Sequence, residues 1–209
     1  MGIIYFLGHF AIVSSLFPLF TFLITKKNKT HIYIKIYVIE VVLSNLINLL
    51  LFHFTKLNQD CFFWCNIFFE TVLIAFVFLE NNDSKVLKKI IYAFFILSTL
   101  LFLFTFKLEL SIRFTFYGTF SRAALTILSI LLIIERYLKS TYDSLFDDYV
   151  FNFSSAVLIY FGLQLYVMIF NNIILNQLDK LFLYTWPIIQ ISSIIYYLLI
   201  SRAIWKLKN

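Results

Sequence analysis

The stretch CFFWCNIFFETVLIAFVFLE (61–80) decides how this chain folds. As a helix it is long enough to cross a hydrocarbon core of about 30 Å, yet Glu70 stands in its middle. A second apolar run, FTFYGTFSRAALTILSILLII (114–134), carries Arg122 in the same way. A charge at that depth costs several kcal/mol unless another group neutralises it. We therefore expect Glu70 and Arg122 to form an ion pair inside a helical bundle.

The composition of the whole chain points to lipid as its solvent. Of the 209 residues, 62% are hydrophobic and 13% are charged, and the mean hydropathy is +0.91. A soluble domain is about 45–50% apolar and about 25% charged. The net charge of +6 does not indicate nucleic-acid binding, because the basic residues lie in short loops between apolar runs.

Seven apolar runs of membrane-spanning length follow one another along the chain. They predict an all-α, polytopic membrane protein, a seven-transmembrane-helix bundle that forms a single transmembrane domain over residues 1–209. The N-terminus lacks the basic region and the cleavage site of a signal peptide, so the first run is expected to remain as a membrane helix. The expected spans are about 2–25, 31–55, 61–80, 89–107, 114–135, 149–172 and 181–204.

Lysine and arginine are distributed unequally between the two sides of this predicted bundle. One side carries twelve of them and the other side four, with Arg122 inside the membrane. Because cytoplasmic loops retain positive charge, the N-terminus is expected outside and the C-terminus in the cytoplasm. The twelve are Lys26, Lys27, Lys29, Lys35, Lys85, Lys88, Lys89, Arg136, Lys139, Arg202, Lys206 and Lys208, and the four are Lys56, Lys107, Arg113 and Lys180.

Further polar residues fall inside the predicted spans at similar depths. At a rise of 1.5 Å per residue, Glu70 and Arg122 lie about 12–13 Å below the outer face, and Glu40 lies about 16 Å below it. A guanidinium donates in a planar fork that suits carboxylate or phosphate, so Arg122 is the expected anchor of an outward-facing pocket for a small anionic or polar ligand. An ion pair that only fixes helix packing explains the same charges. The expected ligand-binding residues are Arg122, Glu70, Glu40, His9, Asn45, Asn48, Gln164 and Gln190.

Other residues carry structural expectations. Pro18 and Pro187 each remove a helix hydrogen bond and are expected to bend the first and seventh spans. The polar loop RYLKSTYDSLFDDY (136–149) is expected to be cytoplasmic, as a docking segment or as a solvated connector. Aromatic residues near the span ends predict an interfacial belt of Tyr5, Tyr33, Tyr37, Trp64, Tyr117, Tyr137, Tyr149, Tyr184, Trp186 and Trp205.

Motifs that carry chemistry are missing from the sequence. There is no H-E-x-x-H, no phosphate-binding glycine loop, no serine with a placed His–Asp pair, and no lysine in the middle of the seventh span. Cys61 and Cys65 lie one turn apart near a helix end, where two small residues are expected rather than a metal site. We therefore expect no enzyme activity, no catalytic residue, no metal and no cofactor.

Three stretches suggest a family. FFETVLIAFVF (68–78), FNFSSAVLIYFGLQLYVMIF (151–170) and LYTWPIIQISSIIYYLLISRAIW (183–205) resemble a family of small uncharacterised seven-span membrane proteins of Bacteroidetes, often encoded near sensor histidine kinases. The positions that carry the resemblance are Glu70, Tyr160, Gly162 and the surroundings of Ser193 and Ala203. The resemblance implies a multi-pass protein of the bacterial inner (cytoplasmic) membrane with a role in sensory input.

Three functions are compatible with these features. The first is a membrane sensor or signalling accessory that binds a ligand from outside and passes a helix shift to a cytoplasmic protein partner such as a histidine kinase. The second is a small-solute transporter with helices grouped three, one and three, although the chain has only four glycines and two prolines. The third is a structural or assembly subunit in which the ion pair specifies packing only.

Overall fold

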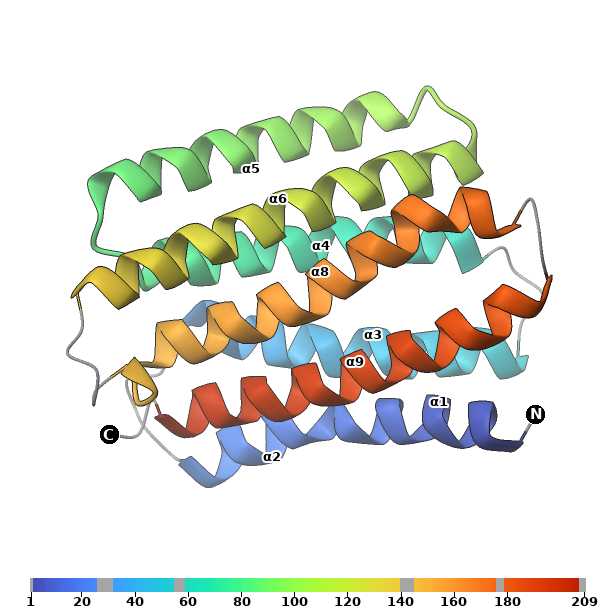
Figure 1. The fold of residues 1–209 in the computed structure, drawn as a ribbon, viewed down its shortest axis with the longest axis horizontal. Coiled ribbons are helices and arrows are strands. Elements are labelled where there is room, and N and C mark those ends of the chain that lie inside the picture. Colours follow the sequence, from blue (N-terminus) through green and yellow to red (C-terminus); the bar gives the residue numbers. More distant parts are fainter. Residues whose placement is uncertain (1, 26–31, 55–58, 140–144, 176–178, 207–209) are drawn as a thin grey trace. The chain divides into compact units, whose positions relative to one another are not determined.

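The computed structural model describes residues 2–25, 32–54, 59–139, 145–175 and 179–206, and the regular elements in these ranges are all α-helices (Figure 1). Within these ranges, seven spans are long and apolar enough to cross a membrane, the first of them made of two helices. The predicted all-α fold and the seven membrane-length spans are therefore confirmed. The helices are α1 (Gly2–Ser14), α2 (Leu16–Thr25), α3 (Ile32–Phe54), α4 (Gln59–Glu80), α5 (Lys85–Thr105), α6 (Leu110–Lys139), α8 (Tyr149–Leu175) and α9 (Asp179–Lys206).

The first span is interrupted at Ser15, between α1 and α2. The Ser15 amide divides its hydrogen bond between the carbonyls of Ala11 and Ile12, each at 3.2 Å. Pro18 explains the position, because it has no N–H and its ring would clash with the carbonyl of Ser14, four residues earlier. The bend expected from Pro18 is thus present as a break in the first span, about one turn before the proline. Pro187, in contrast, lies within the continuous helix α9.

The chain divides into two compact units, one of residues 28–128 and one of residues 1–27 with 129–209. In the first unit, α4 packs against both α3 and α5. In the second unit, α9 lies between α8 on one side and α1 with α2 on the other (Figure 1). Helix α6 contributes its first part to one unit and its last part to the other. The single domain expected over residues 1–209 stays a prediction.

Buried side chains recur every three or four residues along the helices, as the helical period requires. In α4 this buried stripe runs from Trp64 through Ile67, Glu70 and Ile74 to Val77. Glu70 therefore lies on the face of α4 that packs against protein. The exposed face of the same helix includes Phe69, which is 57% exposed and suited to lipid.

The predicted aromatic belt is wrong for several of its members. Trp64, Tyr37 and Tyr117 are at most 2% exposed, so they belong to the protein interior and not to a membrane interface. Tyr137 and Trp205 are exposed near helix ends, where the belt places them. The side chains of Tyr5, Tyr184 and Trp186 lie outside the described part of the chain.

Tyrosines form the centre of the contact between α8 and α9. Tyr160 and Tyr196 stack with ring centroids 4.4 Å apart, and Phe161 meets Tyr196 edge-on at 5.9 Å. Because α8 and α9 run antiparallel, this pairing places Gln164 of α8 at the level of Ser192 of α9. Small buried side chains on the two helices allow this close approach: Ser154, Ala156, Ser192, Ser193 and Ala203.

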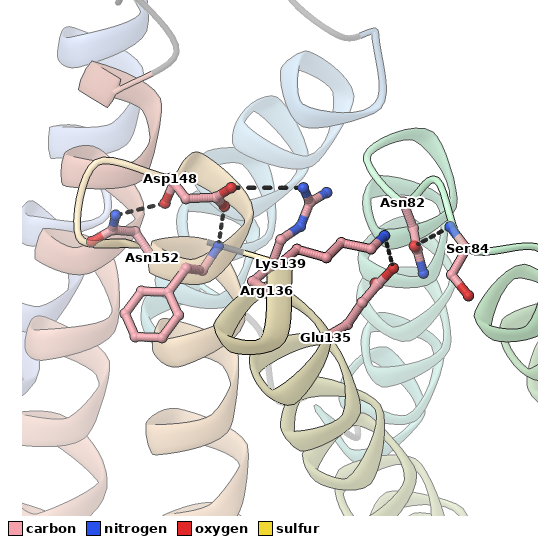
Figure 2. A network of polar contacts seen from close by, with 8 residues as sticks. Asn82, Ser84, Glu135, Arg136, Lys139, Asp148 and Asn152 are labelled. Carbon is pink, nitrogen blue, oxygen red and sulfur yellow. Dashed lines mark hydrogen bonds and ion pairs between the residues drawn. The ribbon is translucent and has the colours of Figure 1, made fainter. Parts of the chain in front are cut away.

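Polar side chains fix the helix ends. Ser84 caps α5, since its hydroxyl accepts from the Leu87 amide at 3.3 Å, and its own amide donates to Asn82 Oδ1 at 2.9 Å (Figure 2). This cap begins α5 at Lys85, four residues before the predicted span. Asp148 caps α8 by accepting from the Phe151 amide at 2.7 Å, and it also meets Arg136 of α6 at 3.7 Å (Figure 2).

The neighbouring carboxylates Asp147 and Asp148 make different contacts. Asp147 pairs with Lys206 at the end of α9, and this hydrogen bond keeps the pKa of the Asp147 carboxyl below its usual range. A lowered pKa means that the stabilisation from this contact is fully present above the ordinary pKa of an aspartate and is lost as the pH falls through the lowered pKa of Asp147. Asp147 is exposed, however, so the contact is screened by solvent.

Asp148→Ala is expected to destabilise the protein by about 1 kcal/mol, because the substitution removes an N-cap. Asp147→Ala is the matched control, with the same charge change one residue away. We expect this control to leave the thermal midpoint in detergent nearly unchanged. Equal shifts for the two variants would show that Asp148 acts through its charge and not through the cap.

Candidate functional site

Glu70 and Arg122 form the predicted ion pair. Arg122 Nη2 of α6 donates to Glu70 Oε2 of α4 at 3.2 Å. The two residues are only 4% and 9% exposed, and each lies within a helix long enough to span a membrane. The pair therefore joins two spans of one unit deep inside the protein, and each charge compensates the burial of the other.

A second polar contact lies in the same unit and connects α5 to α6. Tyr117 Oη and Ser98 Oγ are 2.7 Å apart, and both side chains are buried. Thr71, which follows Glu70 in α4, and Arg122 of α6 lie near the Tyr117 hydroxyl, and the Thr71 hydroxyl donates to the Ile67 carbonyl of its own helix at 2.6 Å. The ion pair thus belongs to a polar cluster that we define as Glu40, Glu70, Thr71, Ser98, Tyr117 and Arg122.

Glu40 is the member of this cluster contributed by α3. It is half-buried, and its carboxyl interacts electrostatically with that of Glu70. Asn45 and Asn48 lie one and two turns further along α3 and are also half-buried. The Asn45 amide donates to the Val41 carbonyl of its own helix at 2.8 Å. Two carboxyls and one guanidinium are therefore gathered on three helices of one unit.

The other predicted site residues belong to the second unit. His9 is exposed on α1, Gln164 is half-buried on α8, and Gln190 is half-buried on α9. Gln164 and Gln190 lie on helices that pack directly together. The expectation that these three residues complete a pocket with Arg122 stays a prediction.

An aromatic layer borders the polar cluster. Phe102 of α5 stacks on Trp64 at 4.2 Å and on Phe68 at 4.1 Å, both from α4, and it meets Tyr117 of α6 at 5.4 Å. At the end of this layer, Arg113 lies over the Trp64 ring and donates to the carbonyls of Leu108 and Phe106 at 2.6 and 2.7 Å. Arg113 therefore ties the α5–α6 turn to α4, and the layer holds α4, α5 and α6 in register.

The sequence interpretation missed Tyr117, Ser98 and Thr71. Tyr117 stands close to the start of a predicted span, where tyrosine is typical of the interface. The signal that marks it is the buried stripe of α6, where Tyr117, Ser121 and Leu125 repeat every four residues. Ser98 similarly falls on the narrow buried face of α5 with Ile91, Phe94 and Thr105.

No protein-family model, curated protein or solved structure matches this chain. The fold and composition define its class as a multi-pass membrane protein, with seven transmembrane-like helices among the residues that the structure describes. Membership of the Bacteroidetes family that it resembles stays a prediction, based on the quoted residues alone.

Proposed function

We propose that the chain is an integral membrane sensor or signalling accessory whose ligand site is the polar cluster around Arg122. The observation that carries this proposal is the buried ion pair of Glu70 and Arg122 within membrane-length helices. Charged residues inside spans are costly and are retained mainly where a pathway, a switch or a ligand uses them. Arg122 supplies the forked donors that a small anionic ligand requires.

The proposal includes an orientation and a partner. The distribution of lysine and arginine favours an outside N-terminus, a cytoplasmic C-terminus and a pocket open to the outside. The resemblance favours the bacterial inner membrane and a histidine kinase as the partner. The chain would pass a change at the cluster to this partner through the ends of α6 and α9, where Arg136, Lys139, Arg202 and Lys206 lie.

The experiment compares variants for signalling and for folding in the same cells. The readout is autophosphorylation of a sensor histidine kinase expressed together with this chain, and its co-purification with the chain. Arg122→Gln combined with Glu70→Gln removes both charges without leaving one buried and unpaired. If this variant folds, the proposal expects loss of signalling.

Two outcomes of this experiment contradict the proposal. Retained signalling in the folded double variant would assign the ion pair to packing only, as in a structural or assembly subunit. An unchanged kinase in cells that lack the chain would remove the signalling role itself. Lys107→Gln serves as a control, because Lys107 is exposed in the turn between α5 and α6 and lies outside the proposed route to the partner.

A small-solute transporter of the three-one-three type is the second candidate. The buried charges suit it equally well, but the helix packing favours it less. A three-one-three carrier groups its first three spans, whereas here the first span packs against the seventh, since α1 and α2 contact α9. Uptake of labelled solutes into proteoliposomes separates the two candidates, because a sensor produces no uptake above empty vesicles.

A further inference from the structure

One short acidic turn joins the ends of α6, α8 and α9. Asp148 Oδ2 lies 3.7 Å from Arg136 Nη1 of α6 (Figure 2). Asp147, the residue before it, pairs with Lys206 at the end of α9. The Asn152 side-chain amide of α8 holds the turn by donating to the Asp148 carbonyl at 2.8 Å. The backbone of the turn is thus fixed, and its two carboxylates reach two different helices.

The two carboxylates are not equally bound to the fold. Asp148 caps α8 by accepting from the Phe151 amide at 2.7 Å, so it cannot leave without disturbing a helix end. The Asp147 side chain is 65% exposed, whereas that of its partner Lys206 is 22% exposed. An exposed ion pair is weak, because water and salt screen it. Another carboxylate can therefore take the place of Asp147 on Lys206 at little cost.

Lys206 has a basic neighbour on the same face of α9. Arg202 precedes it by four residues, about one helical turn, so the two cations project from one side of the helix. Arg202 is exposed, and it forms no ion pair with any residue that the structure describes. Like charges one turn apart repel each other, so an anion that contacts both of them is favoured.

We propose that Arg202 and Lys206 form a binding site for an acidic segment of a partner protein, and that Asp147 occupies this site in the unbound chain. The chemistry of the occupant follows from Asp147 itself, since a side-chain carboxylate already lies against Lys206. An anionic membrane surface fits less well, because it would bring Asp147 and Asp148 against like charge. The inference deepens the proposed function, on which it rests only for the identity of the partner.

Binding of an acidic peptide to variants of the full chain tests this site. The purified chain is held in nanodiscs of zwitterionic phosphatidylcholine, and the probe is a short fluorescent polyglutamate peptide followed by anisotropy. Asp147→Asn is expected to bind the peptide about two- to fivefold more tightly than the wild-type chain, because one exposed competing ion pair is gone. Adding either Arg202→Gln or Lys206→Gln to Asp147→Asn should cancel this gain.

Glu109→Gln is the matched control, because it removes the same charge from an exposed position in the turn between α5 and α6. An effect of net charge alone would tighten binding equally in Glu109→Gln and Asp147→Asn, and that result overturns the proposal. The proposal is also wrong if Asp147→Asn shows no gain, or if the gain survives both second substitutions. Retention of phosphatidylglycerol by the purified chain, lost in Arg202→Gln and Lys206→Gln, in place of peptide binding would assign the pair to a lipid headgroup and overturn it as well.

The peptide measurement involves neither a kinase nor the ion pair of Glu70 and Arg122. A failure here therefore leaves the sensing proposal standing. If the peptide binds as expected and the signalling experiment fails, the basic site remains and only its assignment to a kinase is lost.

Discussion

Replacing Arg122 by glutamine is expected to lower the free energy of unfolding by about 3–5 kcal/mol, because the change leaves Glu70 buried without its cation. Arg122 Nη2 lies 3.2 Å from Glu70 Oε2, and both side chains are shielded from solvent. Glu70→Gln is expected to cost a similar amount, since it leaves Arg122 buried without its carboxylate.

The measurement is equilibrium unfolding in mixed micelles, followed by helical circular dichroism. The double variant Glu70→Gln with Arg122→Gln should be more stable than Arg122→Gln alone, because no charge is left behind. Lys139→Gln is the control for the loss of a basic residue at an exposed position. An Arg122→Gln loss no larger than that of Lys139→Gln would mean that the pair does not contribute to the fold.

Tyr196→Ala is the second substitution with a large expected effect, about 2–3 kcal/mol. Tyr196 is 1% exposed, stacks on Tyr160 and meets Phe161 at the contact between α8 and α9. Lipid is as apolar as a protein core, so the cost comes from the cavity and the lost ring contacts and not from transfer to water. The value is therefore smaller than for a similar truncation in a soluble protein.

The matched control for this prediction is Tyr166→Ala. Tyr166 is a tyrosine of α8 that is 58% exposed, so its truncation leaves no cavity. We expect a loss near zero for this variant in the same unfolding experiment. Equal losses for the two tyrosines would contradict the assignment of Tyr196 to the centre of the α8–α9 contact.

The seven spans and the ion pair could be predicted from the sequence because both follow from the solvent. Lipid requires long apolar helices, and it makes an isolated Glu70 or Arg122 so costly that each predicts the other. A distortion of the first span could be predicted from Pro18, but its position at Ser15 could not. The proline disturbs the helical turn that precedes it and not the turn in which it lies.

Residues whose role depends on neighbouring helices could not be predicted. The packing of α1 and α2 on α9 joins the two ends of the chain, and no local pattern encodes such a choice. Trp64 and Tyr117 lie near span ends, where a position in the interface and a position in the core give the same sequence pattern. Only the pairing of α4 with α5 and α6 shows that they belong to the interior.

The central claim is that Glu70 and Arg122 face each other inside the protein, and cross-linking in cell membranes tests it most directly. The two residues are replaced by cysteine in a chain whose free cysteines, Cys61 and Cys65, are changed to serine. A short bifunctional thiol reagent should join α4 to α6 in this variant. The cross-link should not form when cysteine is placed at the lipid-facing position of Phe69 and not at Glu70. The account would be contradicted if positions 70 and 122 did not cross-link, or if position 69 cross-linked to position 122 equally well.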